Sequence, residues 1–460
     1  MLTPSELFSE TATTEIADKE HRRQLLNIIA KYNEAVPFAK NQYSDLELAK
    51  QRAAFTKWKA LENLDKYLIE FEANFIKRGG KVIWVQDDEE AIKEILAILK
   101  RVKAKCVIKA KSGTTEEISL NSSLKKHQID CINSDIGEYI QQLSNETFDH
   151  PTLPALNKSK EEVARLFNEK YNLPKESSPE DIVKYIRTQL HNQFSQTDVG
   201  ITGANFIVAD IGGIAVSENQ GNGFLSMTFP KVHIAIAGVE KILPTMQDLD
   251  LFWPLLATYG PGQSMTVYNS VLMGPKQPEE NDGPEEMYVI LLDNGRSNLL
   301  DREDQRQALS CIRCGACLNV CPVYQNIGGH AYGGTIGGPI GSIITPHFKG
   351  LKEFKHLSYA STLCGKCTDV CPVKIDLHKL LLLNRRDIID AGLISKTEKG
   401  IYFFWKKGML NRDTMNKGGA TLKNFMLSNF FKKLWGEKRE FPKIAPKSFN
   451  EMWREKHPDL

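Results

Sequence analysis

The sequence contains no apolar run of the roughly 18 residues that a membrane-spanning helix needs. Its most apolar stretches, VHIAIAG and MYVILL, have only the length of a strand. The opening stretch, MLTPSELFSETATTEIADKE, is polar and lacks the charged start and apolar run of a signal peptide. We therefore expect a cytoplasmic protein with neither a membrane span nor a targeting segment.

An excess of charge of one sign is also missing. The formal net charge is only +2 over 460 residues, which gives no reason to expect a nucleic acid partner. Only residues 395–460 are biased, with fifteen Lys and Arg against seven Asp and Glu. A basic docking surface and a solvated helical face both explain this bias, and the second is the simpler interpretation.

Nucleotide-binding signatures are absent as well. No dinucleotide fingerprint, G-x-G-x-x-G, follows a predicted strand, and the glycine-rich segment 328–341 does not match the P-loop pattern G-x-x-x-x-G-K-[ST]. We therefore expect no flavin or NAD bound within this chain. Any redox chemistry must use another cofactor.

The cysteines are concentrated in one part of the chain. Seven of its nine cysteines lie between residues 311 and 371, and the other two, Cys106 and Cys131, are expected in the core. The run CIRCGACLNVCPV has the spacing C-x-x-C-x-x-C-x-x-x-C-P, which is typical of ferredoxin-type iron–sulfur ligation. Structural zinc sites normally pair two C-x-x-C knuckles, which this run fits poorly.

The second motif, STLCGKCTDVCPVKI, has one cysteine fewer. In two-cluster ferredoxins the last cysteine of each motif ligates the other cluster. This rule predicts two cysteine sets. The first set, for cluster 1, is Cys311, Cys314, Cys317 and Cys371; the second set, for cluster 2, is Cys321, Cys364 and Cys367.

Cluster 2 therefore lacks a fourth cysteine. Ser361 stands at the matching position, but serine is a poor ligand, and a second-sphere or incidental Ser361 is the favoured interpretation. We expect two [4Fe–4S] clusters; the second has only three Cys ligands, so a [3Fe–4S] form is the alternative there. His330 and Tyr332, in the glycine-rich segment between the motifs, are candidates for a proton relay or a fourth ligand, although loop anchors are the simpler interpretation.

The spacing of apolar residues divides the rest of the chain into segments. Apolar residues at spacings of three and four predict helices up to Gly79–Gly80, after which short strands alternate with helices, as in an α/β domain with a largely parallel sheet. Sequence segments with a helical pattern flank the cysteines and favour an α-helical ferredoxin domain. The expected parts are an N-terminal helical segment at 1–78, the α/β domain at 79–296, the α-helical ferredoxin domain at 297–394 and a basic aromatic region at 395–460.

One strand-to-helix turn in the α/β domain carries polar residues. Lys111, Ser112 and Thr114 stand where helix N–H groups are able to hold a small anion, although ordinary capping is the favoured interpretation. Thr114 and Glu117 have the spacing of a capping box.

These motifs resemble a known family. The segments CIRCGACLNVCPVYQNIGGHAYG and STLCGKCTDVCPVKIDLHKLLL are similar to the iron–sulfur subunit of lactate-utilisation systems, the lactate-utilisation protein B (LutB) family. Upstream, GTTEEISLN, TGANFIVAD and HIAIAGVEKILP resemble its LUD domain. The resemblance covers roughly residues 50–400, and the family also has three cysteines in the second motif.

The resemblance implies a LUD α/β fold, similar to sugar-phosphate isomerases and CoA-transferases, followed by the ferredoxin domain. It implies an electron carrier in a system that oxidises L-lactate to pyruvate. The implied partners are a cysteine-rich subunit resembling those of heterodisulfide reductases and a smaller LUD-domain subunit, with an unknown electron acceptor.

Three functions remain open from the sequence. The leading hypothesis is an electron-transfer subunit without catalysis of its own. A second makes the chain the catalyst, with the incompletely ligated cluster binding a 2-hydroxy acid as a Lewis acid. The third is a redox- or metabolite-sensing regulatory module.

Overall fold

The computed structural model describes residues 2–144, 158–333, 336–412, 414, 419–430, 440 and 442–458. The chain forms two compact units, Met1–Ile388 and Ile389–Leu460. None of the helices in these ranges combines the length and the apolarity that crossing a bilayer requires.

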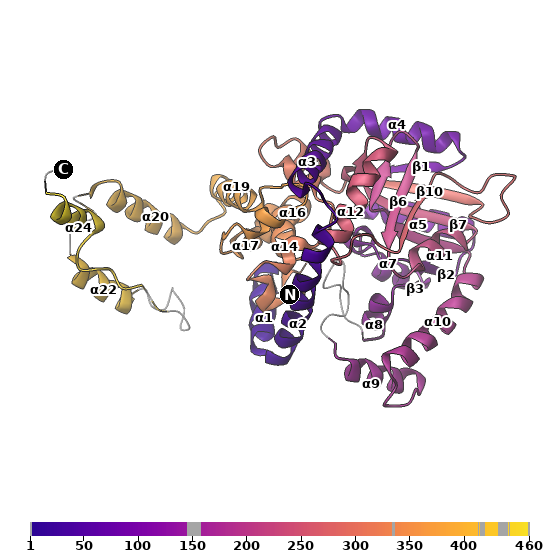
Figure 1. The fold of residues 1–460 in the computed structure, drawn as a ribbon, viewed down its shortest axis with the longest axis horizontal. Helices are drawn as coiled ribbons and strands as arrows, with labels where there is room; N and C mark the ends of the chain where they lie inside the picture. Colours follow the sequence, from indigo (N-terminus) through magenta and orange to yellow (C-terminus); the bar gives the residue numbers. More distant parts are fainter. Residues whose placement is uncertain are drawn as a thin grey trace. The chain divides into compact units, whose positions relative to one another are not determined.

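A six-stranded sheet forms the core of the α/β region of the first unit (Figure 1). All five neighbouring pairs run parallel, in the order β1-β10-β7-β4-β2-β3. The strands are β1 (Lys81–Val85), β2 (Cys106–Lys109), β3 (Asp130–Asn133), β4 (Val199–Gly203), β7 (Val232–Gly238) and β10 (Glu286–Leu292). The expected α/β fold with a parallel sheet is confirmed.

The central strand β7 shows why the sheet is parallel. All seven of its residues, VHIAIAG, are buried, as expected for a strand covered on both faces. His233 shares this burial, and its Nε2 lies 2.8 Å from the hydroxyl of Thr202 on β4. Cys106 and Cys131 lie on the neighbouring strands β2 and β3 and are only half-buried.

Helices connect the parallel strands. Those of the α/β region are α5 (Asp88–Arg101), α6 (Gly113–Glu117), α7 (Leu120–Lys126), α8 (Ile136–Ser144), α9 (Lys160–Tyr171), α10 (Pro179–Gln196), α11 (Asn222–Thr228), α12 (Leu249–Tyr259) and α13 (Arg296–Leu300), with the 3₁₀ turns η1 (Val239–Lys241) and η2 (Met246–Asp248). The capping box expected at Thr114 and Glu117 is wrong. Ser112 caps α6 instead, because its hydroxyl accepts the N–H of Thr115 at 3.3 Å.

A smaller mixed sheet lies beside the main one, in the order β8-β5-β6-β9. Its strands are β5 (Phe206–Val208), β6 (Gly213–Glu218), β8 (Ile242–Leu243) and β9 (Tyr268–Leu272).

Four N-terminal helices precede the sheet: α1 (Pro4–Ala17), α2 (Lys19–Lys40), α3 (Leu46–Glu62) and α4 (Leu64–Lys77). Helix α4 contacts β1, whereas α1 contacts α15 and α17 of the cysteine region, as Figure 1 shows for α1 and α17. Leu25, Phe252 and Leu318 belong to one hydrophobic core, so a single core joins the helical segment, the α/β region and the cysteine region.

The cysteine region is helical, as expected. Its elements are α14 (Ala316–Asn319), α15 (Tyr324–Ile327), α16 (Gly338–Lys349), α17 (Leu351–Tyr359), α18 (Lys366–Val370) and α19 (Leu377–Asp390), with the 3₁₀ turns η3 (Arg306–Ser310) and η4 (His330–Tyr332).

The glycine-rich segment 328–341 is only partly irregular. Its last residues, from Gly338, form the first turn of α16. A Cβ on Gly341 would lie 1.8 Å from the carbonyl oxygen of Ile336, which explains why glycine is needed inside this helix. Gly334 and Thr335 lie outside the described residues.

The second unit contains α20 (Lys396–Met409), α22 (Gly419–Phe430) and α24 (Phe449–Lys456). Helix α20 has no buried residue, and Phe404 and Trp405 are exposed on it. The four domain boundaries expected from the sequence stay predictions.

Candidate iron–sulfur centres

The two cysteine motifs have the same local backbone. Arg313 and Gly315 have φ values of 63° and 83°, and the equivalent Leu363 and Gly365 have values of 54° and 82°. In each motif the left-handed glycine is the N-cap of a short helix, α14 or α18. This turn lets successive cysteines of one backbone segment face a common centre. Ser361 occupies the position equivalent to Cys311.

The four cysteines of the first set line one cavity. Burial raises the pKa of Cys314, and the charges of Cys311 and Cys371 raise it further. The pKa of Cys317 lies well above its usual value because of burial and the same two neighbours, together with Cys314. Cys371, from the second motif, is therefore placed with the first set.

The second set is grouped in the same way. Burial raises the pKa of Cys367 to about 11, and the charges of Cys321 and Cys364 contribute. Cys321, from the first motif, therefore lies with the second motif's cysteines. This arrangement is the one that the crossover rule describes, while ligation by these residues stays a prediction.

The spacing of the cysteines favours a multi-iron cluster over a zinc ion, because structural zinc sites normally pair two C-x-x-C knuckles. Among the described residues, no three His, Cys, Asp or Glu side chains are grouped around one metal position.

Backbone N–H groups directed at the sulfurs also fit a cluster. The N–H of Arg313 donates to Cys311 Sγ at 3.4 Å, and that of Ile375 donates to Cys371 Sγ at 3.3 Å. The backbone N–H of Ile340, at the start of α16, lowers the pKa of Cys317 against the effect of burial. Such donors stabilise thiolates and cluster sulfides.

Each set has two buried cysteines, and the sets differ in that only the second includes an exposed one. Cys364 is exposed, and the backbone N–H of Lys366 lowers the pKa of its thiol. In the first set, Cys314 and Cys371 are buried. Burial raises the pKa of Cys371 to about 11. Deprotonating the first set therefore depends on the positive charge of iron.

Ser361 is engaged in its own loop. Its hydroxyl accepts the N–H of Leu363 at 3.1 Å, and its carbonyl oxygen accepts from Arg385 Nη2 at 3.4 Å. This local role agrees with the incidental interpretation of Ser361, and the fourth ligand of cluster 2 stays unassigned.

Tyr332 lies between the two cysteine sets. Its pKa is well above the usual value because of burial, with further increases from the charges of Cys321 and Cys317. Its hydroxyl is buried and has no hydrogen-bond partner among the described residues. A cluster sulfur is a suitable acceptor for such a donor. His330, on the same turn η4, is half-buried.

A cavity of about 300 Å³ connects the first set with the carboxyl edge of the parallel sheet. Polar residues that follow the strands line one end of it, and the cysteines line the other. The lining residues at the sheet edge include Ser112, Thr114, Gly203, Glu240, Lys241 and Arg296. Ligands of open α/β sheets bind at this edge. The sequence showed the turn at Lys111, Ser112 and Thr114 but gave no sign that it faces the cysteines.

A buried ion network lies beside this cavity. Arg296 donates to both carboxylate oxygens of Glu117, at 2.8 and 2.9 Å, and to Glu240 at 2.5 Å. Arg313 Nη2 lies 3.4 Å from the other oxygen of Glu240. The pKa of Glu240 falls to about 2 because these cations outweigh the effect of burial. Glu240 therefore ties the cysteine loop to the end of β7.

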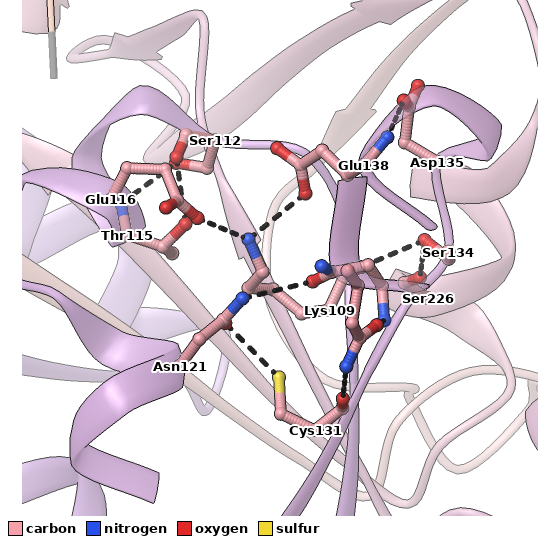
Figure 2. A network of polar contacts seen from close by, with 12 residues as sticks. Lys109, Ser112, Thr115, Glu116, Asn121, Cys131, Ser134, Asp135, Glu138 and Ser226 are labelled. Carbon is pink, nitrogen blue, oxygen red and sulfur yellow. Dashed lines mark hydrogen bonds and ion pairs between the residues drawn. The ribbon is translucent and has the colours of Figure 1, made fainter. Parts of the chain in front are cut away.

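A second buried network supports the same sheet edge (Figure 2). Lys109, at the end of β2, donates to Glu116 at 2.7 Å and to Glu138 at 3.1 Å. Burial alone would lower the pKa of Lys109, but the charges of Glu138 and Glu116 raise it. The triad ties α6 and α8 to β2 and so holds the turn at Ser112. Neither network left a recognisable sequence signal, since its members are ordinary charged residues at no periodic spacing.

Comparison with known proteins gives two family matches. Residues 68–292 match the LUD domain, and residues 307–375 match the 4Fe-4S dicluster domain. A LUD domain followed by a 4Fe-4S dicluster domain is thus the class of protein that this fold and site define.

Curated relatives extend the match over most of the chain. "Lactate utilization protein B" of Bacillus cereus (strain AH820) is 41% identical over 406 residues, which cover 86% of this chain and 85% of the relative. The protein of the same name from Bacillus cytotoxicus is 41% identical over 407 residues, with the same coverage. The chain belongs to the lactate utilization protein B family.

One solved structure is also similar, a DUF162 family protein from Deinococcus radiodurans. It is 14% identical, covers 50% of this chain and 98% of its own, and has a TM-score of 0.29.

Proposed function

We propose that this chain is the iron–sulfur electron-transfer subunit of an L-lactate oxidation system. The observation that carries the proposal is the pair of cysteine sets within the part matched to a 4Fe-4S dicluster domain. The name of the curated relatives supports lactate as the substrate of the system.

Oxidation of L-lactate to pyruvate releases two electrons and two protons, and an iron–sulfur cluster takes up one electron at a time. The chain's own residues supply the setting. The two motifs hold the clusters side by side, because Cys317 and Cys321 are four positions apart on one backbone segment. Cys314 and Leu318 are buried in the apolar core that surrounds part of the first set.

The proposal includes partners. A cysteine-rich subunit resembling those of heterodisulfide reductases and a smaller LUD-domain subunit would exchange electrons with this chain, together with an unidentified acceptor. The exposed Cys364 supports a contact at the second set, since electron transfer needs a close approach between donor and acceptor.

The test is low-temperature EPR on anaerobically purified chain, as isolated, after dithionite, and with L-lactate. We expect two interacting reduced [4Fe–4S] signals that L-lactate leaves unchanged in the isolated chain. Adding the two partner subunits with L-lactate should then produce the reduced signals without dithionite.

Two results would contradict the proposal. An oxidised [3Fe–4S] signal that changes on adding L-lactate to the chain alone would make this chain the catalyst, through the corner near Ser361. A full complement of zinc with no iron signal would exclude electron transfer altogether.

A further inference from the structure

Lys57 is a buried cation close to the first cysteine set. Its side chain is 1% exposed, and its Nζ donates to the carbonyl oxygens of Glu240 at 2.5 Å and Ile242 at 3.3 Å. No carboxylate of the described residues forms an ion pair with it. Burial lowers its pKa to about 8, while the charges of Glu240 and Cys311 act in the opposite direction. A buried ammonium is costly unless an anion lies near.

Lys241 is a second cation at the same place. It lines the cavity with the first set, and in the described part of the chain its ammonium makes no hydrogen bond or ion pair. Burial and then the charge of Arg313 lower its pKa to about 8, and the charges of Glu240 and Cys311 oppose this. The lysine therefore stands beside the cysteines without a carboxylate of its own.

The arginines of the network complete the charge balance. Arg296 is fully engaged by Glu117 and Glu240. Arg313 approaches only Glu240, at 3.4 Å, and its buried Nη1 has no partner among the described residues.

Within the ion network beside the first set, four cations face two carboxylates, which leaves two positive charges in excess in that network; Lys111, Asp135 and Glu218 also line the cavity. The network consists of Lys57, Lys241, Arg296 and Arg313 against Glu117 and Glu240. The anion that matches this excess is a [4Fe–4S] cluster with its four thiolates, whose net charge is about −2 when oxidised. At the second set the backbone N–H and the charge of Lys366 lower the pKa of Cys364, but this cysteine is exposed and solvent screens the cation.

We propose that Lys57, Lys241 and Arg313 are the counter-charges of cluster 1 and hold its reduction potential above that of cluster 2. Reduction adds a negative charge, which nearby cations stabilise most where they are little screened by solvent. At equilibrium the electron then occupies cluster 1, next to the cavity at the sheet edge. Cluster 2, with the exposed Cys364, is the cluster that exchanges electrons with the partner. The inference rests on the proposed function, because it requires two reducible clusters.

The test is a redox titration of the full chain with both clusters, followed by EPR. The signal that survives in Cys364→Ala identifies cluster 1. We expect Lys241→Met to lower the potential of cluster 1 relative to cluster 2, so that the equilibrium constant for sharing an electron shifts about tenfold, or about 59 mV for a one-electron couple. Lys241→Arg should restore the potential.

Lys231→Met is the matched control, because Lys231 is an exposed lysine, with its nearest carboxylate, that of Asp198, 3.8 Å away. It should leave both potentials unchanged. Lys57→Met should act as Lys241→Met does, and if that variant fails to fold, the Lys241 variants decide the matter.

The inference is overturned if Lys241→Met leaves the difference between the two potentials unchanged, or if Lys231→Met shifts it equally. If the wild-type chain has two reducible clusters and either of these results is found, this inference is wrong but the proposed function stands. A wild-type chain without two reducible clusters would sink the proposed function with it.

Discussion

At the scale of single residues, Cys371 and Cys321 each lie with the cysteines of the other motif. Cys371 follows α18 in the second motif but lies with Cys311 and Cys314, and its side chain is 7% exposed. Each motif therefore contributes to both sets, so that neither cluster is expected to assemble from one motif alone.

We expect the Cys371→Ala chain to lose the same cluster signal as Cys314→Ala, not the signal lost in Cys364→Ala. Cys321→Ala should instead behave like Cys367→Ala, because its sulfur belongs to the second set. Iron content and EPR of the reconstituted chains measure this. Cys131→Ala, outside both sets, is the control and should keep all iron. Loss of the Cys364-type signal in Cys371→Ala would refute the crossover.

Two glycines of the cysteine region should respond differently to alanine. Gly365 has φ +82° but nothing within 4 Å of an added Cβ, so Gly365→Ala meets backbone strain alone, about 1–2 kcal/mol of stability. An added Cβ at Gly341 meets the carbonyl oxygen of Ile336 at 1.8 Å, so Gly341→Ala should cost at least about 3 kcal/mol.

Denaturant unfolding under anaerobic conditions compares the two variants. Gly400→Ala is a control, since nothing lies within 4 Å of its added Cβ and its φ is not in the left-handed region. Equal losses for Gly341→Ala and Gly365→Ala would show that α16 moves to relieve the contact.

At the scale of elements, the central strand β7 carries a buried titratable group. Burial lowers the pKa of His233 to about 3, well below the ordinary value near 6.5. The unfolded chain therefore binds a proton that the folded chain excludes between these two pH values. The stability contributed by neutral His233 is fully present above pH 6.5 and is lost as the pH falls toward about 3.

His233→Gln should flatten the stability profile below pH 6.5 by about 1.4 kcal/mol per pH unit, which is the effect of one proton. Chemical unfolding between pH 7 and about pH 5 measures the slope. His127→Gln, at an exposed histidine after α7, should leave the slope of the wild type. An unchanged slope in His233→Gln would mean that other groups dominate acid unfolding.

The two cysteine loops are another feature at this scale. Both loops have the same left-handed residues followed by a short helix, so the same local structure occurs twice. Ser361 stands in place of a cysteine in the second copy. The second copy is the exposed one, which agrees with a contact surface for a partner.

At the scale of the whole molecule, the cysteine sets lie inside the core that joins the first unit. Cys314, Cys321, Cys367 and Cys371 belong to the same hydrophobic core as Leu25 and Phe252. A cofactor bound there stabilises the helical segment, the sheet and the cysteine region together, because binding to the folded state shifts the unfolding equilibrium.

Removal of iron under anaerobic conditions should therefore lower the thermal midpoint of the first unit by several degrees. The helices of residues 396–456 should not respond, since they belong to the other compact unit. Calorimetry of the loaded and stripped chain, with amide exchange to locate the change, tests this. An unchanged midpoint after complete iron removal would show that the core forms without the clusters.

The sequence by itself determined the local chemistry. The spacing of Cys311 to Cys321 and of Cys364 to Cys371 predicts iron–sulfur ligation, because two-residue gaps are set by backbone geometry within one turn. Buried runs such as VHIAIAG determined the parallel sheet through hydrophobic burial on both faces. These signals are local, so no tertiary contact was needed to see them.

Only the tertiary structure decided what surrounds the first set. Lys57, Lys241 and Arg296 come from three distant segments, and nothing in their own neighbourhoods marks them as partners of cysteines. The capping role expected of Glu117 failed for the same reason, since its partner Arg296 lies 179 positions away. Long-range pairing of buried charges depends on the packing of the chain, and a single sequence carries no periodic pattern for it.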